Sequence, residues 1–297
     1  MNVYKEKDYT SHDVVAIIRK MFGKIKTGHT GTLDPNAEGV LPICIGRATK
    51  LAGYLTAENK SYRAQLLLGT STDTYDHTGQ VLRTSPIDPH KINAATIKEA
   101  TDFFTGVYMQ EPPMYSAIKV NGKKLYKLAR EGKTIERKPR QVKISRIVTS
   151  DFDPESNSLW LEVDCSKGTY IRSLCADIGN RLGCGGCMGE LIRTKSGAFD
   201  LSSAKRLSEI AKEDIENIIV PINRAFPALQ GFVTESIKAA LNGKSVQLEH
   251  VRFDENNSQL NEDAYCWLFH ENKIIGLYTL EEDRLRLEVM IHENSRE

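Results

Sequence analysis

The chain has 297 residues, 40% of them hydrophobic and 27% charged, and a formal net charge of +1 at pH 7. This length leaves room for one large domain and one small domain, and the apolar content is sufficient for ordinary cores. The apolar runs are far shorter than the ~18 residues that span a bilayer, and residues 1–8 hold no apolar signal region, so we expect a cytoplasmic protein and no membrane association.

The first predicted element is a helix over residues 11–23. Thr10 or Ser11 can cap its start, and Gly23 can end it. The apolar positions of this stretch repeat with helical spacing and form one face, which consists of Val14, Ile17, Ile18, Met21 and Phe22.

A stretch rich in glycine and proline follows at residues 28–42, with the sequence GHTGTLDPNAEGVLP. Its three glycines and two prolines argue against a regular helix or a central strand. The stretch runs into a short apolar segment, residues 41–45, which anchors it to the core. An anchored loop that carries His29, Asp34 and several hydroxyl groups is typical of a functional site. The alternative is a tight turn in which Asp34 only caps a backbone N–H group.

A short helix and a strand are predicted next. The helix has its apolar positions at Ala48, Leu51, Ala52 and Leu55. Alternation of apolar and polar residues predicts a strand over residues 62–68. On spacing alone, Tyr62 is a core aromatic residue of this strand. Its ring also suits a second role, because every nucleobase presents a π-face on which a tyrosine can stack.

Residues 69–79 form a polar cluster that predicts a turn and contains Asp76. Such a cluster is most often a capped loop. No set of histidines, cysteines and carboxylates in the sequence has the spacing of metal ligands, so no metal site is expected. The six cysteines are irregularly spaced and fit free thiols, and the isolated pair Cys184 and Cys187 lacks the further ligands of a zinc site.

A predicted helix around residues 97–104 precedes a strongly basic segment. Between Lys119 and Arg146, eleven basic residues stand against two acidic ones, which leaves about nine excess positive charges. A solvated charged face is the usual explanation of a lysine-rich run. Here the strong bias in sign and the interleaved tyrosines favour RNA phosphates. The residues that we expect to bind RNA are Lys119, Lys123, Lys124, Lys127 and Arg130.

Another strand is predicted over residues 161–165, and it leads into a helix whose apolar face begins at Ile171. Arg172 therefore lies in the first turn of this helix. From residue 226 the chain reads as a second unit, with a helix near residues 234–241 and strands near residues 264–269, 273–279 and 284–291. From Leu201 onward, acidic residues outnumber basic ones by 17 to 11, so an RNA-binding face in this unit must be local, or the unit is mainly structural.

Together these stretches resemble the TruB family of tRNA pseudouridine synthases. Residues 28–42 are similar to the family's active-site loop, G-H-x-G-x-L-D-P, and further matches follow in the family's order along most of the chain. These further matches are residues 60–62, 69–79, 111–132, 165–172 and 190–197. There are two departures: Glu6 and Asp8 replace Pro and Gly of the family's K-P-x-G-x-T-S motif, and Ile192 replaces an Arg of L-R-R-T-x-S-G.

The resemblance implies an α+β fold. It predicts a pseudouridine synthase catalytic domain, built on a mixed, mostly antiparallel sheet with flanking helices, and a small β-rich PUA-like domain at the C-terminal end. We expect the catalytic domain to comprise residues 1–225, with a basic RNA-binding segment at about 112–146, and the PUA-like domain to comprise residues 226–297.

The resemblance also implies the roles of individual residues. The Asp of the family's loop motif is catalytic, the Arg at the position of Arg172 pairs with it, and the Tyr at the position of Tyr62 packs against the target base. The target uridine of a folded tRNA is stacked and has to be flipped out, so His29 is expected to occupy or brace the space that the base leaves. The implied site consists of Asp34 as the catalytic residue, with Tyr62, Arg172, His29, Asp76 and Lys5 in support.

The implied substrate is uridine 55 in the T arm of tRNA. No cofactor is expected, because the isomerisation involves neither oxidation nor hydrolysis, and the sequence has no P-loop or dinucleotide fingerprint. We expect a monomer that acts alone, the alternative being targeting by a guide RNA of the dyskerin kind. A non-enzymatic alternative is an RNA-folding chaperone. The sequence leaves open whether Asp34 attacks the ribose, attacks the uracil ring or removes a sugar proton.

Overall fold

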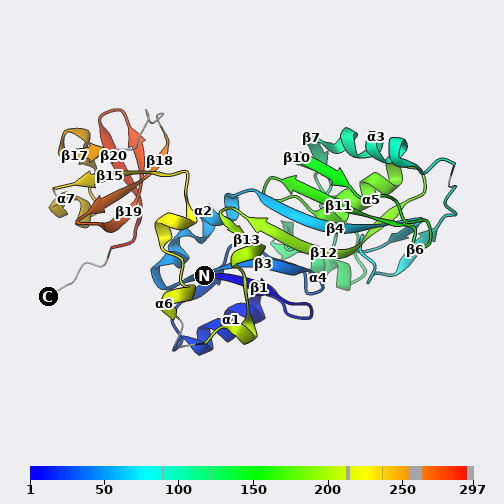
Figure 1. The fold of residues 1–297 in the computed structure, drawn as a ribbon, viewed down its shortest axis with the longest axis horizontal. Coiled ribbons are helices and arrows are strands. Elements are labelled where there is room, and N and C mark those ends of the chain that lie inside the picture. The colour runs from blue at the N-terminus through cyan, green and yellow to red at the C-terminus, as the bar shows by residue number, and fades with distance from the viewer. Residues whose placement is uncertain (89, 121, 212–214, 236, 254–262, 293–297) are drawn as a thin grey trace.

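The computed structural model describes residues 1–88, 90–120, 122–211, 215–235, 237–253 and 263–292. Two sheets lie toward opposite ends of an elongated molecule, a large one formed by the first two thirds of the chain and a small one near the C-terminus (Figure 1). The large sheet comprises β1 (Asn2–Lys5), β2 (Thr27–His29), β3 (Glu38–Ile45), β4 (Lys60–Leu68), β7 (Gly106–Gln110), β10 (Arg140–Thr149), β11 (Ser158–Cys165), β12 (Gly186–Ser196), β13 (Phe199–Asp200) and β14 (Lys205–Arg206).

The large sheet is mixed and mostly antiparallel, as predicted. Its strands run in the order β14-β1-β3-β12-β4-β11-β10-β7, with β2 paired to β3 and β13 paired to β12. Among the described strands of this sheet, only the pairs β1 with β14 and β3 with β12 are parallel. β12 is long and bulged, with register shifts between Met188 and Leu191 and between Arg193 and Lys195.

The helices of the described residues are short. They are α1 (Ser11–Met21), α2 (Ala52–Ala57), α3 (Ala94–Phe104), α4 (Leu125–Arg130), α5 (Ile171–Arg181), α6 (Ile215–Ile218) and α7 (Ile237–Leu241). Thr10 caps α1 through its hydroxyl and exchanges hydrogen bonds with Asp13, as a capping box does. α3 and α5 cover one face of the sheet and share one apolar core with β4 and β11. No helix among the described residues is long and apolar enough to cross a membrane.

The small sheet near the C-terminus is β-rich as predicted. Its strands are β15 (Gln230–Thr234), β16 (Val246–Gln247), β17 (Val251–Phe253), β18 (Tyr265–His270), β19 (Lys273–Glu281) and β20 (Arg284–Met290), in the order β16-β20-β19-β18-β15-β17. The prediction of a helix near residues 234–241 was wrong at its start, because Thr234 ends strand β15. Phe232 of this strand is fully buried, and β15 pairs with both β17 and β18.

One apolar cluster joins the small sheet to the rest of the chain. Trp267 of β18 and Leu277 of β19 pack with Val40 of β3 and with Leu51 and Leu55 next to and within α2. All five side chains are buried. The small sheet is therefore packed onto the strand that follows the loop at residues 30–37.

The sequence prediction for residues 28–42 was partly wrong, because β3 is an interior strand that contains Gly39 and Pro42. On one side of β3, β12 pairs only with Glu38 and Gly39, and β2 pairs only with residues 43–45. Pro42 lies in the interval between these two partners, where the lack of an N–H group costs no ladder hydrogen bond.

Candidate active site

The loop between β2 and β3 is held in place from both sides of Asp34. The backbone N–H of Leu33 donates to the hydroxyl of Ser11 at 2.9 Å, and the N–H of Ala37 donates to the carbonyl of Asp34 at 3.0 Å. Leu33 and Ala37 are both buried in the core that α3 and α5 share with the sheet. Because Leu33 and Ala37 point into the core, Asp34 between them lies at the surface of this core, facing α5.

Lys5 supports the same loop from strand β1. Its side chain is 0% exposed, and its ammonium group donates to the carbonyls of Pro35 at 3.0 Å and Ala37 at 2.6 Å. Burial lowers the pKa of Lys5 to about 8, against the opposing effect of Glu38 and Asp34. The structure thus places Lys5 beneath the loop, where it acts on the backbone.

Arg172 lies beside Asp34 at the start of α5. Its side chain is buried, and its Nε is 3.0 Å from Oδ2 of Asp34, while its Nη1 is 3.4 Å from Oδ2 of Asp76. Nη1 also donates to the carbonyl of Thr74 at 3.1 Å, and Nη2 donates to the carbonyl of Tyr115 at 3.0 Å. One guanidinium therefore connects the loop of Asp34, the turn of Asp76 and the beginning of the basic segment.

The carboxyl group of Asp34 has a raised pKa. Although 43% of its side-chain surface is accessible, burial of the carboxylate raises the pKa above its usual range. The Arg172 guanidinium opposes this shift, and the neighbouring carboxylate of Asp76 adds to it. Arg172 thus offsets only part of the cost of placing a charged carboxylate here.

Asp76 reaches the site because its turn is paired to the bulge of β12. The N–H of His77 donates to the carbonyl of Met188 at 2.8 Å, and the N–H of Met188 donates to the carbonyl of Tyr75 at 2.9 Å. The other carboxylate oxygen of Asp76 accepts from the hydroxyl of Thr78 at 2.6 Å. Bulges commonly re-aim side chains next to active sites, and this one brings a second carboxylate to Arg172.

Tyr62 and His29 lie on β4 and β2. Burial raises the pKa of Tyr62, and Asp34 is among the charges that act on its hydroxyl. Burial lowers the pKa of His29, so its ring is neutral at pH 7. Because the N–H of Gly31 donates to Nδ1 of His29 at 3.3 Å, the ring hydrogen is on Nε2.

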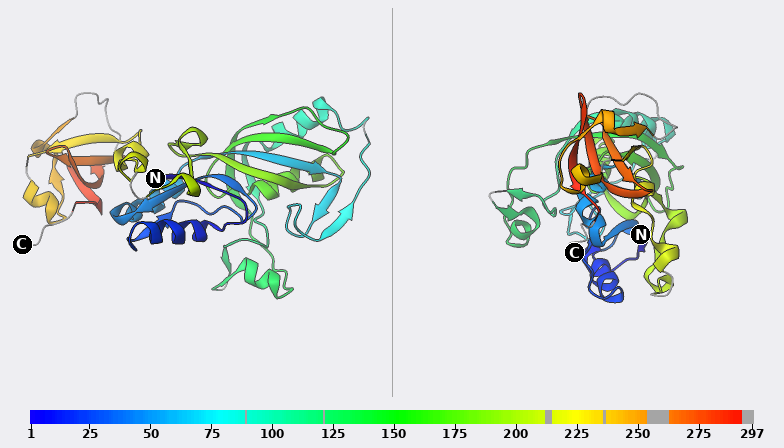
Figure 2. Two further views of the ribbon diagram at one scale, coloured as in Figure 1. Left: turned by 60° about the horizontal axis from the view of Figure 1, so that its bottom comes forward. Right: turned by 90° about the vertical axis from the view of Figure 1, so that its left-hand side faces the viewer.

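The five residues predicted to bind RNA lie on other elements than the site residues. Lys119, Lys123 and Lys124 lie on the two-stranded ribbon of β8 (Lys119–Val120) and β9 (Lys123–Lys124), and Lys127 and Arg130 lie on α4. This ribbon and α4 project away from the large sheet (Figure 2, left). Within the described residues, none of these five side chains forms an ion pair. Lys124 and Arg130 each lie 5.6 Å from the ring centre of Tyr126.

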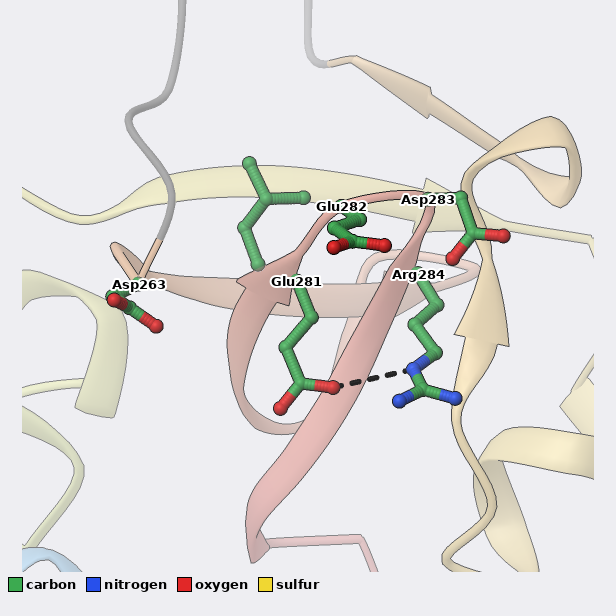
Figure 3. A pocket seen from close by; sticks show the side chains of 6 residues that line it. Asp263, Glu281, Glu282, Asp283 and Arg284 are labelled. Atoms are coloured by element: carbon green, nitrogen blue, oxygen red, sulfur yellow. Dashed lines mark hydrogen bonds and ion pairs between the residues drawn. The ribbon is translucent and has the colours of Figure 1, made fainter.

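The described part of the small sheet also carries an acidic pocket of about 470 Å³. Figure 3 shows its carboxylates, which belong to Asp263, Glu281, Glu282 and Asp283, and the contact of 3.2 Å between Glu281 and Arg284. Four carboxylates against one guanidinium disfavour the binding of phosphates at this pocket.

Sequence reasoning gave no role to Arg193, although residues 190–197 were recognised as a matching motif. Arg193 is 1% exposed, and its side chain bonds to the carbonyls of Val40 and Gly31 on either side of Asp34. The sequence held one signal for this role, which is a basic residue at a position where the strand pattern predicts a buried side chain. The contact of Arg172 with the carbonyl of Tyr115 had no signal in the sequence.

The family models match most of the first three quarters of the chain. Residues 19–171 match the model described as TruB family pseudouridylate synthase (N terminal domain), and residues 172–226 match tRNA pseudouridylate synthase B C-terminal domain. Similar proteins include the tRNA pseudouridine synthase B of Alkaliphilus oremlandii, with 43% identity over 93% of this chain and 91% of that protein. The protein of the same name from Lachnoclostridium phytofermentans is 45% identical over 96% and 95% of the two chains.

Solved structures share the fold. A chain in a structure described as an H/ACA RNP bound to a substrate RNA containing 2'-deoxyuridine superposes with a TM-score of 0.73 and 21% identity, covering 99% of this chain and 85% of that one. A chain of a Cbf5-Nop10-Gar1 complex gives a TM-score of 0.73 at 24% identity, covering 98% and 83%. On the family models and on relatives that match along almost their whole length, the chain belongs to the TruB family of pseudouridylate synthases.

Proposed function

We propose that this protein converts uridine 55 in the T arm of tRNA to pseudouridine, and that it does so alone. The observation that carries the proposal is the pair of Asp34 and Arg172, a carboxylate at 3.0 Å from a buried guanidinium at the edge of an apolar core. The relatives that match along nearly their whole length are named tRNA pseudouridine synthase B, which supports tRNA as the substrate.

The reaction needs only groups that this chain supplies. The bond between N1 and C1′ breaks, a bond between C5 and C1′ forms, the proton on C5 leaves, and N1 gains a proton. Because nothing is oxidised or hydrolysed, no cofactor is required. A carboxylate can act as nucleophile or base at a glycosidic centre, and Asp34 has this role. Arg172 keeps its carboxylate ionised and aimed, since an adjacent cation favours the charged form.

The target base reaches Asp34 by leaving the RNA stack, which costs a few kcal/mol. The ring of Tyr62 offers a face on which the flipped base stacks. His29, neutral and half-buried, braces the space that the base has left. Asp76 and Lys5 support Asp34 without touching the base. Asp76 forms an ion pair with Nη1 of Arg172, and Lys5 holds the backbone of the loop.

The basic segment supplies the affinity for RNA. Lys119, Lys123, Lys127 and Arg130 are exposed and carry charge that no described carboxylate pairs with. Such charges bind phosphates without reading sequence. A pure RNA chaperone would also use this surface, but it would have no need of the arrangement around Asp34.

The positions of the two sheets along the chain also support a division into two domains. We place the boundary of the catalytic domain at residue 225 and assign residues 226–297 to a PUA-like domain, because the strands of the second sheet begin at Gln230. The enzyme acts as a monomer in the cytoplasm, and its C-terminal domain supports the catalytic domain.

The test uses a T-arm transcript that carries tritium on uracil C5, incubated with the protein and without any guide RNA. Tritium is released only if C5 loses its hydrogen, so release at catalytic rates is the expected result. Asp34→Asn is the control and should abolish release while leaving the dissociation constant for tRNA within a few-fold. Release that survives in Asp34→Asn contradicts the role of Asp34, and release that requires an added guide RNA contradicts the stand-alone reaction.

A further inference from the structure

Arg193 contacts both sides of the loop that holds Asp34. It lies on β12, and its guanidinium is among the largest fully buried groups of the described residues. Nε donates to the carbonyl of Val40 at 2.7 Å, and Nη2 donates to the carbonyl of Gly31 at 3.2 Å. Gly31 precedes Asp34 and Val40 follows it, so one planar group sets the separation of the two ends of the loop.

Tyr62 is the neighbour of Arg193 across the sheet. The two residues are directly opposite each other on β12 and β4. Burial raises the pKa of the Tyr62 hydroxyl, and the charge of Arg193 lowers it by a smaller effect. Arg193 therefore lies next to the residue on which, in the proposed function, the flipped base stacks, as well as next to the loop of Asp34.

The charge of Arg193 is not balanced by a carboxylate. Within the part of the chain that the structure describes, Arg193 forms no ion pair, and the acceptors of its side chain are two backbone carbonyls. A buried cation without an acidic partner is costly for stability, so stability alone does not account for its presence. The same charge contributes to the lowered pKa of His29, after burial.

We propose that Arg193 is a positioning residue for the isomerisation. It fixes the two ends of the loop so that Asp34 faces Arg172. At 1% exposure it does not touch the RNA. This inference rests on the proposed function, because it concerns the geometry of that same site.

Arg193→Lys and Arg193→Ala test the proposal. Lysine keeps the charge, but its single ammonium cannot take the place of a planar group that reaches one acceptor on each side of Asp34. We expect the single-turnover rate of tritium release to fall at least about 100-fold in both variants, since small misplacements of reacting groups cost this much. The dissociation constant for tRNA should stay within threefold of the parent. Methylguanidinium should restore part of the rate of Arg193→Ala, and methylammonium should not.

Two further measurements separate positioning from folding. In Arg193→Lys, amide exchange over residues 30–41 should accelerate while exchange in β18 to β20 stays unchanged. The matched control is Lys60→Met: Lys60 is 6% exposed and donates to the carbonyls of Thr56 and Glu58, outside the loop. It should lower stability without lowering the rate per folded molecule.

The outcomes are distinct. An Arg193→Lys variant with the parent's rate per folded molecule and the parent's exchange in the loop overturns the inference and leaves the proposed function intact. Equal rescue by methylammonium overturns the claim that the planar donor set is needed. Absence of tritium release from the parent protein overturns the proposed function itself, and the exchange experiment then still reports whether Arg193 holds the loop.

Discussion

A Cβ atom added to Gly39 would lie 2.3 Å from the carbonyl oxygen of Arg193. The two residues are partners in the parallel pairing of β3 with β12, and Gly39 has a φ angle of +104°, which side chains rarely allow. The close approach of these strands is what brings the guanidinium of Arg193 beneath the loop of Asp34. Glycine is therefore required at position 39 for two reasons: a side chain would clash with the backbone of Arg193, and its backbone conformation disfavours other residues.

Gly39→Ala should destabilise the protein strongly. The atoms that crowd the new methyl group are backbone atoms of Arg193, which cannot turn aside. We expect the melting temperature to fall by at least about 5 °C, from overpacking of 1–3 kcal/mol together with backbone strain. Gly28→Ala is the matched control, because a Cβ at Gly28 meets no atom within 4 Å. Equal melting temperatures for the two variants would contradict the strand geometry.

Tyr62→Leu separates a stacking role from a packing role. Leucine keeps the apolar bulk but removes the ring face and the hydroxyl, so a site residue should lose turnover by orders of magnitude. A residue that serves only the core should instead lose stability, by about 1–3 kcal/mol. We expect a melting temperature within a few degrees of the parent. The melting curve and the single-turnover rate are measured on one preparation, and a large loss of stability with near-normal turnover would refute the stacking role.

Replacing Lys123, Lys124 and Lys127 by glutamine should flatten the salt dependence of tRNA binding. Each phosphate that a lysine neutralises releases counterions, so the slope of log affinity against log salt should decrease by about one for each lysine that contacts a phosphate. The matched control replaces Lys20, Lys24 and Lys26 by glutamine; these three lysines are exposed, and the change in net charge is the same. If both triple variants change the slope alike, the basic segment is not a specific RNA surface.

Lys5→Met should change the way in which the free energy of unfolding depends on pH, because Lys5 is a buried cation. The native pKa of Lys5 is about 8, compared with 10.5 for the ordinary side chain, so between these values the unfolded chain binds a proton that the native protein does not. The free energy of unfolding of the parent should therefore rise relative to Lys5→Met above pH 8, by at most about 1.4 kcal/mol per pH unit. Below pH 7 the difference should be constant.

Urea denaturation at pH 6, 7, 8, 9 and 10 measures this difference. Lys7→Met provides the control, since Lys7 is exposed and its contact with Glu190 raises its pKa. Its difference from the parent should not rise in this range. A constant difference for Lys5→Met from pH 7 to pH 10 would show that Lys5 is not a buried cation.

Much of the fold could be predicted from local patterns. The alternation of β4 and the apolar faces of α1 and α5 depend on neighbouring residues, and each was confirmed. The strand character of β3 could not be predicted, because Gly39 and Pro42 are compatible with a strand only through the particular spacing of β12 and β2 along it. Thr234 was placed in a helix because its pairing with Val251 depends on distant residues.

Part of the candidate site could also be predicted from the sequence, and part could not. The motifs named Asp34 and Arg172, and the ion pair between them is found in the structure. The route by which Asp76 arrives, through pairing of its turn with the bulge at Met188, depends on contacts between residues far apart in the sequence. The same is true of Arg193, whose acceptors lie on strand β3 and in the loop between β2 and β3. Sequence patterns identify the side chains, and long-range packing determines which backbone groups hold them.

Val40 belongs to two parts of the molecule at once. Its side chain packs against Trp267 and Leu277 of the small sheet, while its carbonyl accepts the hydrogen bond from Arg193. A chain cut before the small sheet would thus lose the apolar side chains that pack against Val40, close behind the Asp34 loop. We therefore expect a form of this protein without the small sheet to have a less rigid active site than the full chain.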